Sequence, residues 1–180
     1  PIRLIGYPCG PFFRLQMMLL DGRETLSSFR CDRLTQALAA SGHALRLDAT
    51  RIVFAIDGGD PAQLPRYGEL LDATAAGEAF DADTFVVLPR LGTISPWASK
   101  ATEILRGAGL PLDRVERGMR YRVAGFAALS GAEQAKVLRQ LHDPMTQSVF
   151  RSVEAIVELF RHESARALGR VALAGDAQAA

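Results

Sequence analysis

Residues 84–100 read TFVVLPRLGTISPWASK, and this stretch joins a strand pattern directly to the start of a helix. Four consecutive apolar residues at 85–88 are typical of a buried β-strand. Gly92 permits a tight or left-handed turn, and Ser95 followed by Pro96 is a helix N-cap with proline at the first helical position. The stretch therefore predicts a buried strand over 84–88, a short loop, and a helix over 96–108.

The loop places polar and basic side chains around the predicted helix N-terminus, where backbone N–H groups can hold a phosphate or a carboxylate. An alternative is that these side chains only cap the helix and order the loop, because no GxxxxGK[ST] or GxGxxG pattern supports a nucleotide site. A surface that contacts another protein is a further possibility. The candidate residues for an interface or an anion site are Arg90, Gly92, Thr93, Ser95, Trp97, Ser99 and Lys100.

The same order of elements is predicted on both sides of residue 80. Residues 16–21 and 45–56 have strand patterns and enclose a helix over 29–40 that Ser27 can cap. A second helix is predicted over 61–76 after a turn. A strand over 114–124 then completes a second strand–helix–strand series, which indicates a duplicated α+β unit.

From Ser130 onward the sequence predicts helix alone. Ser130 and Glu133 have the spacing of a capping box, and Asp143-Pro144 is a second N-cap with proline at the first helical position. Seven apolar residues then share one side of a helix that would have to bury them. They are Met145, Val149, Phe150, Val153, Ile156, Val157 and Phe160.

Composition excludes several classes of protein. The 180 residues are 48% hydrophobic and 23% charged, which disfavours disorder over most of the length. The 21 basic and 20 acidic residues nearly cancel, so no strong field attracts nucleic acid or an anionic membrane. Apolar runs are far too short to span a bilayer, and two cysteines cannot form a disulfide scaffold. With only two cysteines we expect a cytoplasmic protein, and no short Cys/His spacing resembles a metal site. No motif for a nucleotide cradle or an activated cysteine is present, so we expect no catalytic residue in this segment.

One basic cluster keeps a different class of function open. Arg114, Arg117, Arg120 and Arg122 surround Tyr121 on a predicted strand. Such a face could make the chain a stand-alone module that binds nucleic acid or a phosphate ligand. The balanced net charge and the absence of a recognised RNA-binding signature argue against nucleic acid as a partner.

The sequence also resembles a known family. The run VVLPRLGTISPWASKATEIL at 86–105, with Val-Glu-Arg-Gly at 115–118, resembles the N-terminal domain of phosphoribosylformylglycinamidine synthase in its large single-chain form. That family has a loop like R-P-G-T-I-S-P-W-S-S-K-A-T, so Leu91 stands where proline is usual and Ala98 where serine is usual. The stretches LSSFR at 26–30 and LHDPMTQSVF at 141–150 are similar to further family motifs.

The resemblance implies an α+β fold with duplicated strand–helix–strand units. These units would form antiparallel sheet(s) with helices on one side, followed by a helical linker. We expect an irregular extension over 1–15, the duplicated domain over 16–128, the linker over 129–168 and a tail over 169–180.

The resemblance also implies a role in purine biosynthesis. The complete enzyme is an ATP-dependent carbon–nitrogen ligase and glutamine amidotransferase that converts formylglycinamide ribonucleotide to the amidine. Its synthetase core, with ATP and Mg, and its glutaminase lie downstream in the family and would be the partners of this segment. The segment itself would hold no cofactor and would act in docking, with the apolar stripe and the Trp97 loop facing the synthetase core.

Overall fold

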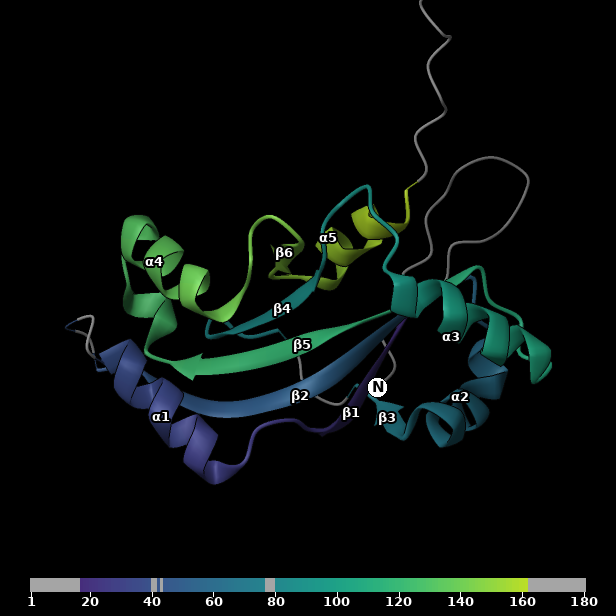
Figure 1. The fold of residues 1–180 in the computed structure, drawn as a ribbon, viewed down its shortest axis with the longest axis horizontal. Coiled ribbons are helices and arrows are strands. Elements are labelled where there is room, and N and C mark those ends of the chain that lie inside the picture. Colours follow the sequence, from purple (N-terminus) through teal and green to yellow (C-terminus); the bar gives the residue numbers. More distant parts are fainter. Residues whose placement is uncertain (1–16, 40–41, 43, 77–79, 162–180) are drawn as a thin grey trace, which may run out of the picture.

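The computed structural model describes residues 17–39, 42, 44–76 and 80–161. In this part of the chain, a six-stranded sheet has the order β3-β1-β2-β5-β4-β6, and all neighbouring strands are antiparallel. The α+β fold with an antiparallel sheet is therefore confirmed (Figure 1).

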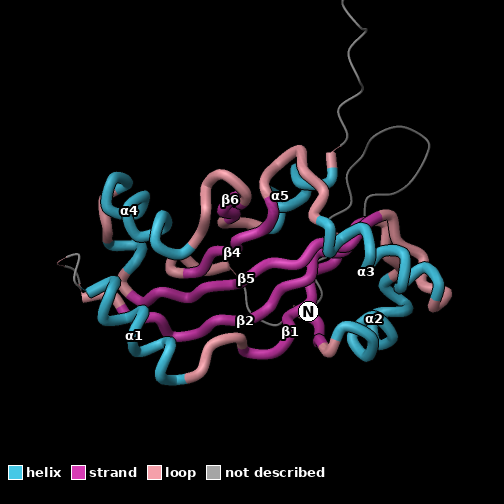
Figure 2. The backbone as a smooth tube through the Cα atoms, in the orientation of Figure 1, coloured by secondary structure: helices cyan, strands magenta, loops and turns pink. Residues whose placement is uncertain are grey.

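The elements occur twice in the same order. Each series is strand, helix, strand, 3-10 helix, helix, short strand. Figure 2 shows how these helices and strands follow one another along the backbone. The first comprises β1 (Met18–Glu24), α1 (Ser28–Ala39), β2 (Arg46–Asp57), the 3-10 helix Pro61–Gln63, α2 (Leu64–Leu71) and β3 (Ala73–Ala75). The second comprises β4 (Thr84–Pro89), α3 (Pro96–Gly107), β5 (Arg114–Ala124), the 3-10 helix Phe126–Ala128, α4 (Gly131–Leu141) and β6 (Gln147–Phe150).

The sheet order relates these two repeats by an approximate two-fold axis. The axis passes between the central strands β2 and β5, where Ile52 lies opposite Met119. It exchanges β1 with β4 and β3 with β6, so the order of strands is the same from either edge of the sheet. The duplication expected from the sequence is thus larger than a strand–helix–strand unit, because it includes α2 and α4 and the two edge strands.

Side-chain contacts repeat with the elements. Thr35 Oγ1 on α1 accepts a hydrogen bond from the Leu47 N–H of β2 at 3.1 Å. Thr102 Oγ1 on α3 accepts one from the Val115 N–H of β5, also at 3.1 Å. An arginine then pairs with the acid two residues later in both repeats, Arg46 with Asp48 and Arg114 with Glu116.

The helices α1 to α4 cover one face of the sheet in two groups. Helices α2 and α3 lie over one end, in a cluster with Leu20, Phe54 and Ile56. Helices α1 and α4 lie over the other end, in a cluster with Phe85 and Val87 (Figure 1). Each cluster takes residues from both repeats, so neither repeat has a core of its own.

The opposite face of the sheet is covered by the last described segment. Helix α5 (Val153–Val157) and the 3-10 helix Glu158–Phe160 pack on Val53, Ala55, Val86 and Leu88. Successive residues of a strand point to opposite faces, which is why Val53 and Phe54 lie in different clusters.

Two predicted helices need correction. The helix expected after Asp143 is wrong at its start, because residues 147–150 form strand β6, which pairs with β4. Five of the seven stripe residues lie in the core cluster on the second face, while Met145 is 74% exposed and Val149 lies against the first face. The helix predicted over 61–76 ends at Leu71, since Asp72 adopts a left-handed conformation (φ 50°) and β3 follows.

The buried stripe also overturns part of the docking hypothesis. Phe150, Val153, Ile156 and Phe160 are each less than a tenth exposed, against the sheet of their own chain. They are therefore not free to face a synthetase core.

The predicted extension over 1–15 and the tail over 169–180 lie outside the described residues, and the boundaries at 128 and 168 stay predictions. In the described part of the chain, no helix is long and apolar enough to cross a membrane.

Candidate functional site

The loop between β4 and α3 is a compact turn held at both ends. The Thr93 N–H and Oγ1 donate to the Arg90 carbonyl oxygen at 3.1 and 2.6 Å. Gly92 lies at the tip with a φ of +78°, a left-handed value that glycine adopts without strain. The Arg90 N–H donates to the Thr146 carbonyl oxygen at 2.9 Å, so the segment before β6 fixes the start of the loop.

Glu116 on β5 holds the other end of the loop. Its side chain is fully buried. One carboxylate oxygen accepts from the Ser95 N–H at 3.2 Å, and the other accepts from Ser95 Oγ at 2.8 Å. Ser95 Oγ in turn accepts from the Ala98 N–H at 3.0 Å and so caps α3 as predicted. The acid that a helix N-terminus favours is thus supplied by the chain itself.

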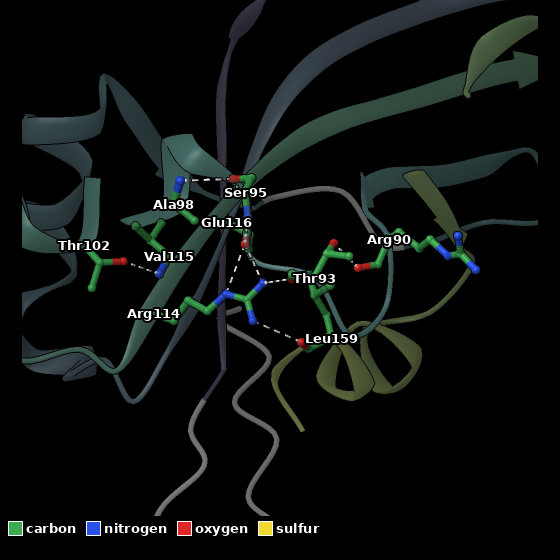
Figure 3. A network of polar contacts seen from close by, with 9 residues as sticks. All are labelled: Arg90, Thr93, Ser95, Ala98, Thr102, Arg114, Val115, Glu116 and Leu159. Atoms are coloured by element: carbon green, nitrogen blue, oxygen red, sulfur yellow. Dashed lines mark hydrogen bonds and ion pairs between the residues drawn. The ribbon is translucent and has the colours of Figure 1, made fainter. Parts of the chain in front are cut away.

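Arg114 joins β5 to the loop and to the segment that follows α5 (Figure 3). We call the place where these segments meet the start of α3 the corner. Its Nε donates to Glu116 Oε1 at 3.0 Å and its Nη2 to the Thr93 carbonyl oxygen at 2.6 Å. Its Nη1 donates to the Leu159 carbonyl oxygen at 3.4 Å, and its guanidinium lies 5.4 Å from the centre of the Phe160 ring. One arginine therefore ties together β5, the loop and the segment that follows α5.

Trp97 is held between β2 and β5. Its ring lies 5.8 Å from the ring of Phe54, and the guanidinium of Arg117 lies 4.9 Å above it. The next residue, Gly118, has no room for a side chain, because an added Cβ would lie 2.1 Å from the Val87 carbonyl oxygen. The stretch 114–118 therefore contributes Arg114, Glu116 and Arg117 to the contacts of the loop and of Trp97.

The structure separates the seven predicted candidates into groups. Ser95 and Trp97 belong to the internal network, and Thr93 joins it through its carbonyl oxygen. The Arg90 side chain points away from the network (Figure 3). Gly92 is exposed at the tip of the loop. Ser99 and Lys100 are exposed on α3, where Lys100 Nζ lies 3.9 Å from Glu103 Oε2.

Arg114 and Glu116 were not among the seven loop candidates, and the sequence suggested Arg114 only as part of a basic strand face. The family-like stretch at 115–118 was a usable signal, since Glu116 is the only acid in a strand that also carries four arginines, and a buried acid needs a partner. Two other omitted residues, Leu91 and Ile94, are 48% and 55% exposed on the loop. The corner thus has a hydrogen-bonded polar interior, and two apolar side chains are exposed on its outer surface.

The four arginines proposed as a basic strand face do not form one open surface, because Arg114 and Arg120 are largely buried in ion pairs. Arg120 is buried and its Nη2 lies 3.2 Å from Asp21 Oδ1, while Arg122 Nη2 lies 3.3 Å from Asp81 Oδ2. The hydrogen bond from Thr84, together with a smaller effect of the Arg122 charge, lowers the pKa of Asp81. Arg114 is paired with Glu116, whereas Arg117 is exposed and its guanidinium lies over the Trp97 ring. Over the described residues, no group of three or more His, Cys, Asp or Glu side chains could hold a metal ion.

A family model described as "Formylglycinamide ribonucleotide amidotransferase N-terminal" matches residues 55–160. The matched range is more than half of the chain and contains the whole corner from Arg90 to Phe160. The chain belongs to this family.

The resemblance seen in the loop sequence is thereby confirmed. Most of the first repeat, up to Phe54, lies outside the matched range. Leu91 and Ala98 depart from the usual family loop in this amidotransferase domain. The Leu91 side chain is 48% exposed, and Ala98 is buried and donates its N–H to the Ser95 cap.

Proposed function

We propose that this amidotransferase N-terminal domain docks the other parts of the same enzyme. The complete enzyme would be the ligase of purine biosynthesis that uses ATP and glutamine to convert formylglycinamide ribonucleotide to the amidine. The synthetase core, with ATP and Mg²⁺, and the glutaminase would be the partners. Catalytic residues would lie in those parts, and the enzyme would work in the cytoplasm.

The observation that carries this proposal is the exposed apolar tip of a rigid corner. We call Arg90, Leu91, Thr93 and Ile94 the loop surface. All four are exposed. The backbone of the loop is held from below, because Glu116 accepts from the Ser95 N–H and Arg114 donates to the Thr93 carbonyl oxygen. A pre-ordered loop loses little conformational entropy on association, and exposed apolar side chains with an arginine are typical of the centre of an interface.

Of the two contacts expected from the sequence, the apolar stripe and the Trp97 loop, only the loop remains a proposed contact. The stripe is already buried within the chain, so it supports the loop indirectly through Leu159 and Phe160.

The test is association with a synthetase–glutaminase fragment that lacks this domain. We expect the wild-type chain to bind the fragment and to raise its glutamine-dependent amidine formation. The double variant Leu91→Asp/Ile94→Asp should weaken binding at least about tenfold, because two apolar contacts would be replaced by desolvated charges.

The matched control is Ile104→Asp. Ile104 is 61% exposed on α3, the helix that follows the loop. Its replacement also puts a charge in place of an exposed apolar side chain, but at a position outside the loop surface. Circular dichroism would show that each variant is folded. Equal binding by the loop variant and the wild type would exclude the proposed surface, and no binding by the wild type would exclude docking.

A further inference from the structure

A second feature of the first face is a hollow of about 340 Å³ between β1, β2, α2 and α3. Its apolar lining includes Ile52, Phe54, Leu71 and Trp97. These four side chains also belong to the cluster under α2 and α3. The hollow is therefore an indentation in the core wall at this end of the sheet.

The hollow exists because the first repeat lacks a side chain that the second repeat has. The two-fold relation makes Ile52 of the first repeat equivalent to Met119 of the second. Two residues further along each strand, Phe54 is equivalent to Tyr121. Phe54 pairs with Leu20, and Tyr121 pairs with Phe85.

Two residues beyond these partners, Gly22 is therefore equivalent to Val87. Val87 is 2% exposed and fills its cluster. An added Cβ at Gly22 would lie 3.1 Å from atoms of both Ile52 and Phe54, which line the hollow.

Two arginine side chains also line the hollow. Arg23 and Arg117 both line it and both are exposed. Within the described residues, neither guanidinium forms an ion pair, whereas Arg117 lies over the ring of Trp97. Asp72 is the one acid of the lining, so the charge there is positive on balance.

We propose that this hollow binds a small ligand that has one planar ring and one phosphate or carboxylate group. The ring would lie against the apolar wall of Ile52, Phe54, Leu71 and Trp97, where burial of its apolar surface would stabilise it. The anion would lie between Arg23 and Arg117, whose planar guanidinium groups suit such oxygens. Apolar walls with a few convergent polar groups are the usual composition of a small-molecule site.

The chain carries its own reporter for this site, since Trp97 is its only tryptophan. The probe is 4-nitrophenyl phosphate, whose nitrophenyl ring quenches tryptophan fluorescence. We expect saturable quenching that inorganic phosphate and 4-nitrobenzyl alcohol do not reproduce, because each has only one of the two groups.

Two variants locate the binding. Gly22→Val introduces the side chain of the second repeat and should abolish saturable quenching. Arg23→Ala removes one cation from an exposed position and should weaken binding about tenfold. Arg139→Ala, at the end of α4, is the matched control and should leave binding unchanged.

Quenching that is linear in probe concentration, or that the uncharged alcohol reproduces, would overturn the proposal. So would saturable quenching that both Gly22→Val and Arg23→Ala leave intact. If Gly22→Val fails to fold, Arg23→Ala decides the question, because that side chain is exposed.

Discussion

Glu116 is the residue on which the candidate site depends most. A buried carboxylate is costly unless hydrogen bonds and a cation compensate for the lost water. Here Ser95 and Arg114 supply both, and each connects Glu116 to a different part of the corner. Removal of the carboxylate would leave Arg114 largely buried beside an empty space.

We therefore expect Glu116→Ala to lower the free energy of unfolding by about 3–5 kcal/mol, the usual cost of breaking a buried ion pair. Urea denaturation measures this loss. Glu103→Ala is the control, since its ion pair with Lys100 is 77% exposed on both sides and such pairs contribute at most about 1 kcal/mol. Similar losses for both variants would contradict the role of Glu116.

Burial also acts on two tyrosines. It raises the pKa of both Tyr67 and Tyr121. A phenol with a raised pKa in the folded state stabilises the protein fully below the pKa of the unfolded chain, about 10. This stabilisation is lost as the pH rises above that value.

The expected result is an unfolding free energy that is constant with respect to these groups up to about pH 9.5 and falls above about pH 10. Tyr121→Phe should make the fall smaller, because one of the two phenols is gone. Urea denaturation over that pH range measures the effect. An identical fall in the variant would show that the Tyr121 phenol is equally accessible in both states.

At the scale of elements, strand β6 differs most clearly from the helix that the sequence predicts. Residues 145–160 satisfy a helical apolar period, but Asp143 caps no helix: its Oδ1 accepts from the Met145 N–H at 2.9 Å within a turn that leads into β6. The chain nevertheless forms a strand at 147–150 because the exposed edge of β4 offers backbone partners to it. Periodicity predicted which side chains are buried better than it predicted their conformation.

Phe150 and Met145 distinguish the strand from the helical stripe. In the predicted helix both residues share the buried side. In the structure Phe150 is 4% exposed and Met145 is 74% exposed. Phe150→Ala should therefore cost about 3–5 kcal/mol of unfolding free energy, and Met145→Ala less than about 0.5 kcal/mol. Thermal or urea unfolding measures both, and equal costs would favour the helix.

At the scale of the whole molecule, the two repeats cannot be separated. Strands β2 and β5 pair from Arg46–Ala124 to Asp57–Arg114, and both clusters of the first face contain residues of both repeats. The core of either repeat is thus completed by the other. This arrangement resembles an obligate dimer whose subunits have been joined.

Unfolding should consequently be a single cooperative transition. Trp97 fluorescence reports the contact between the repeats, since Trp97 belongs to the second and Phe54 to the first. Far-ultraviolet circular dichroism reports the helices and strands of both. We expect the two urea curves to coincide, and separate midpoints would mean that the repeats unfold independently.

The sequence by itself determined the local structure around the loop and most of the fold class. Ser95 and Pro96 start α3, Gly92 makes the turn, and the alternating residues of β2 lie on opposite faces, because caps, glycine conformations and strand periodicity depend on neighbouring residues only.

Tertiary structure decided the rest. Glu116 holds Ser95 across 21 residues of sequence. Gly22 leaves a hollow only because Phe54 and Trp97 pack nearby. The edge of β4 turns a helical pattern into a strand. Each of these depends on which distant segments the sheet brings together, and no local pattern contains that information.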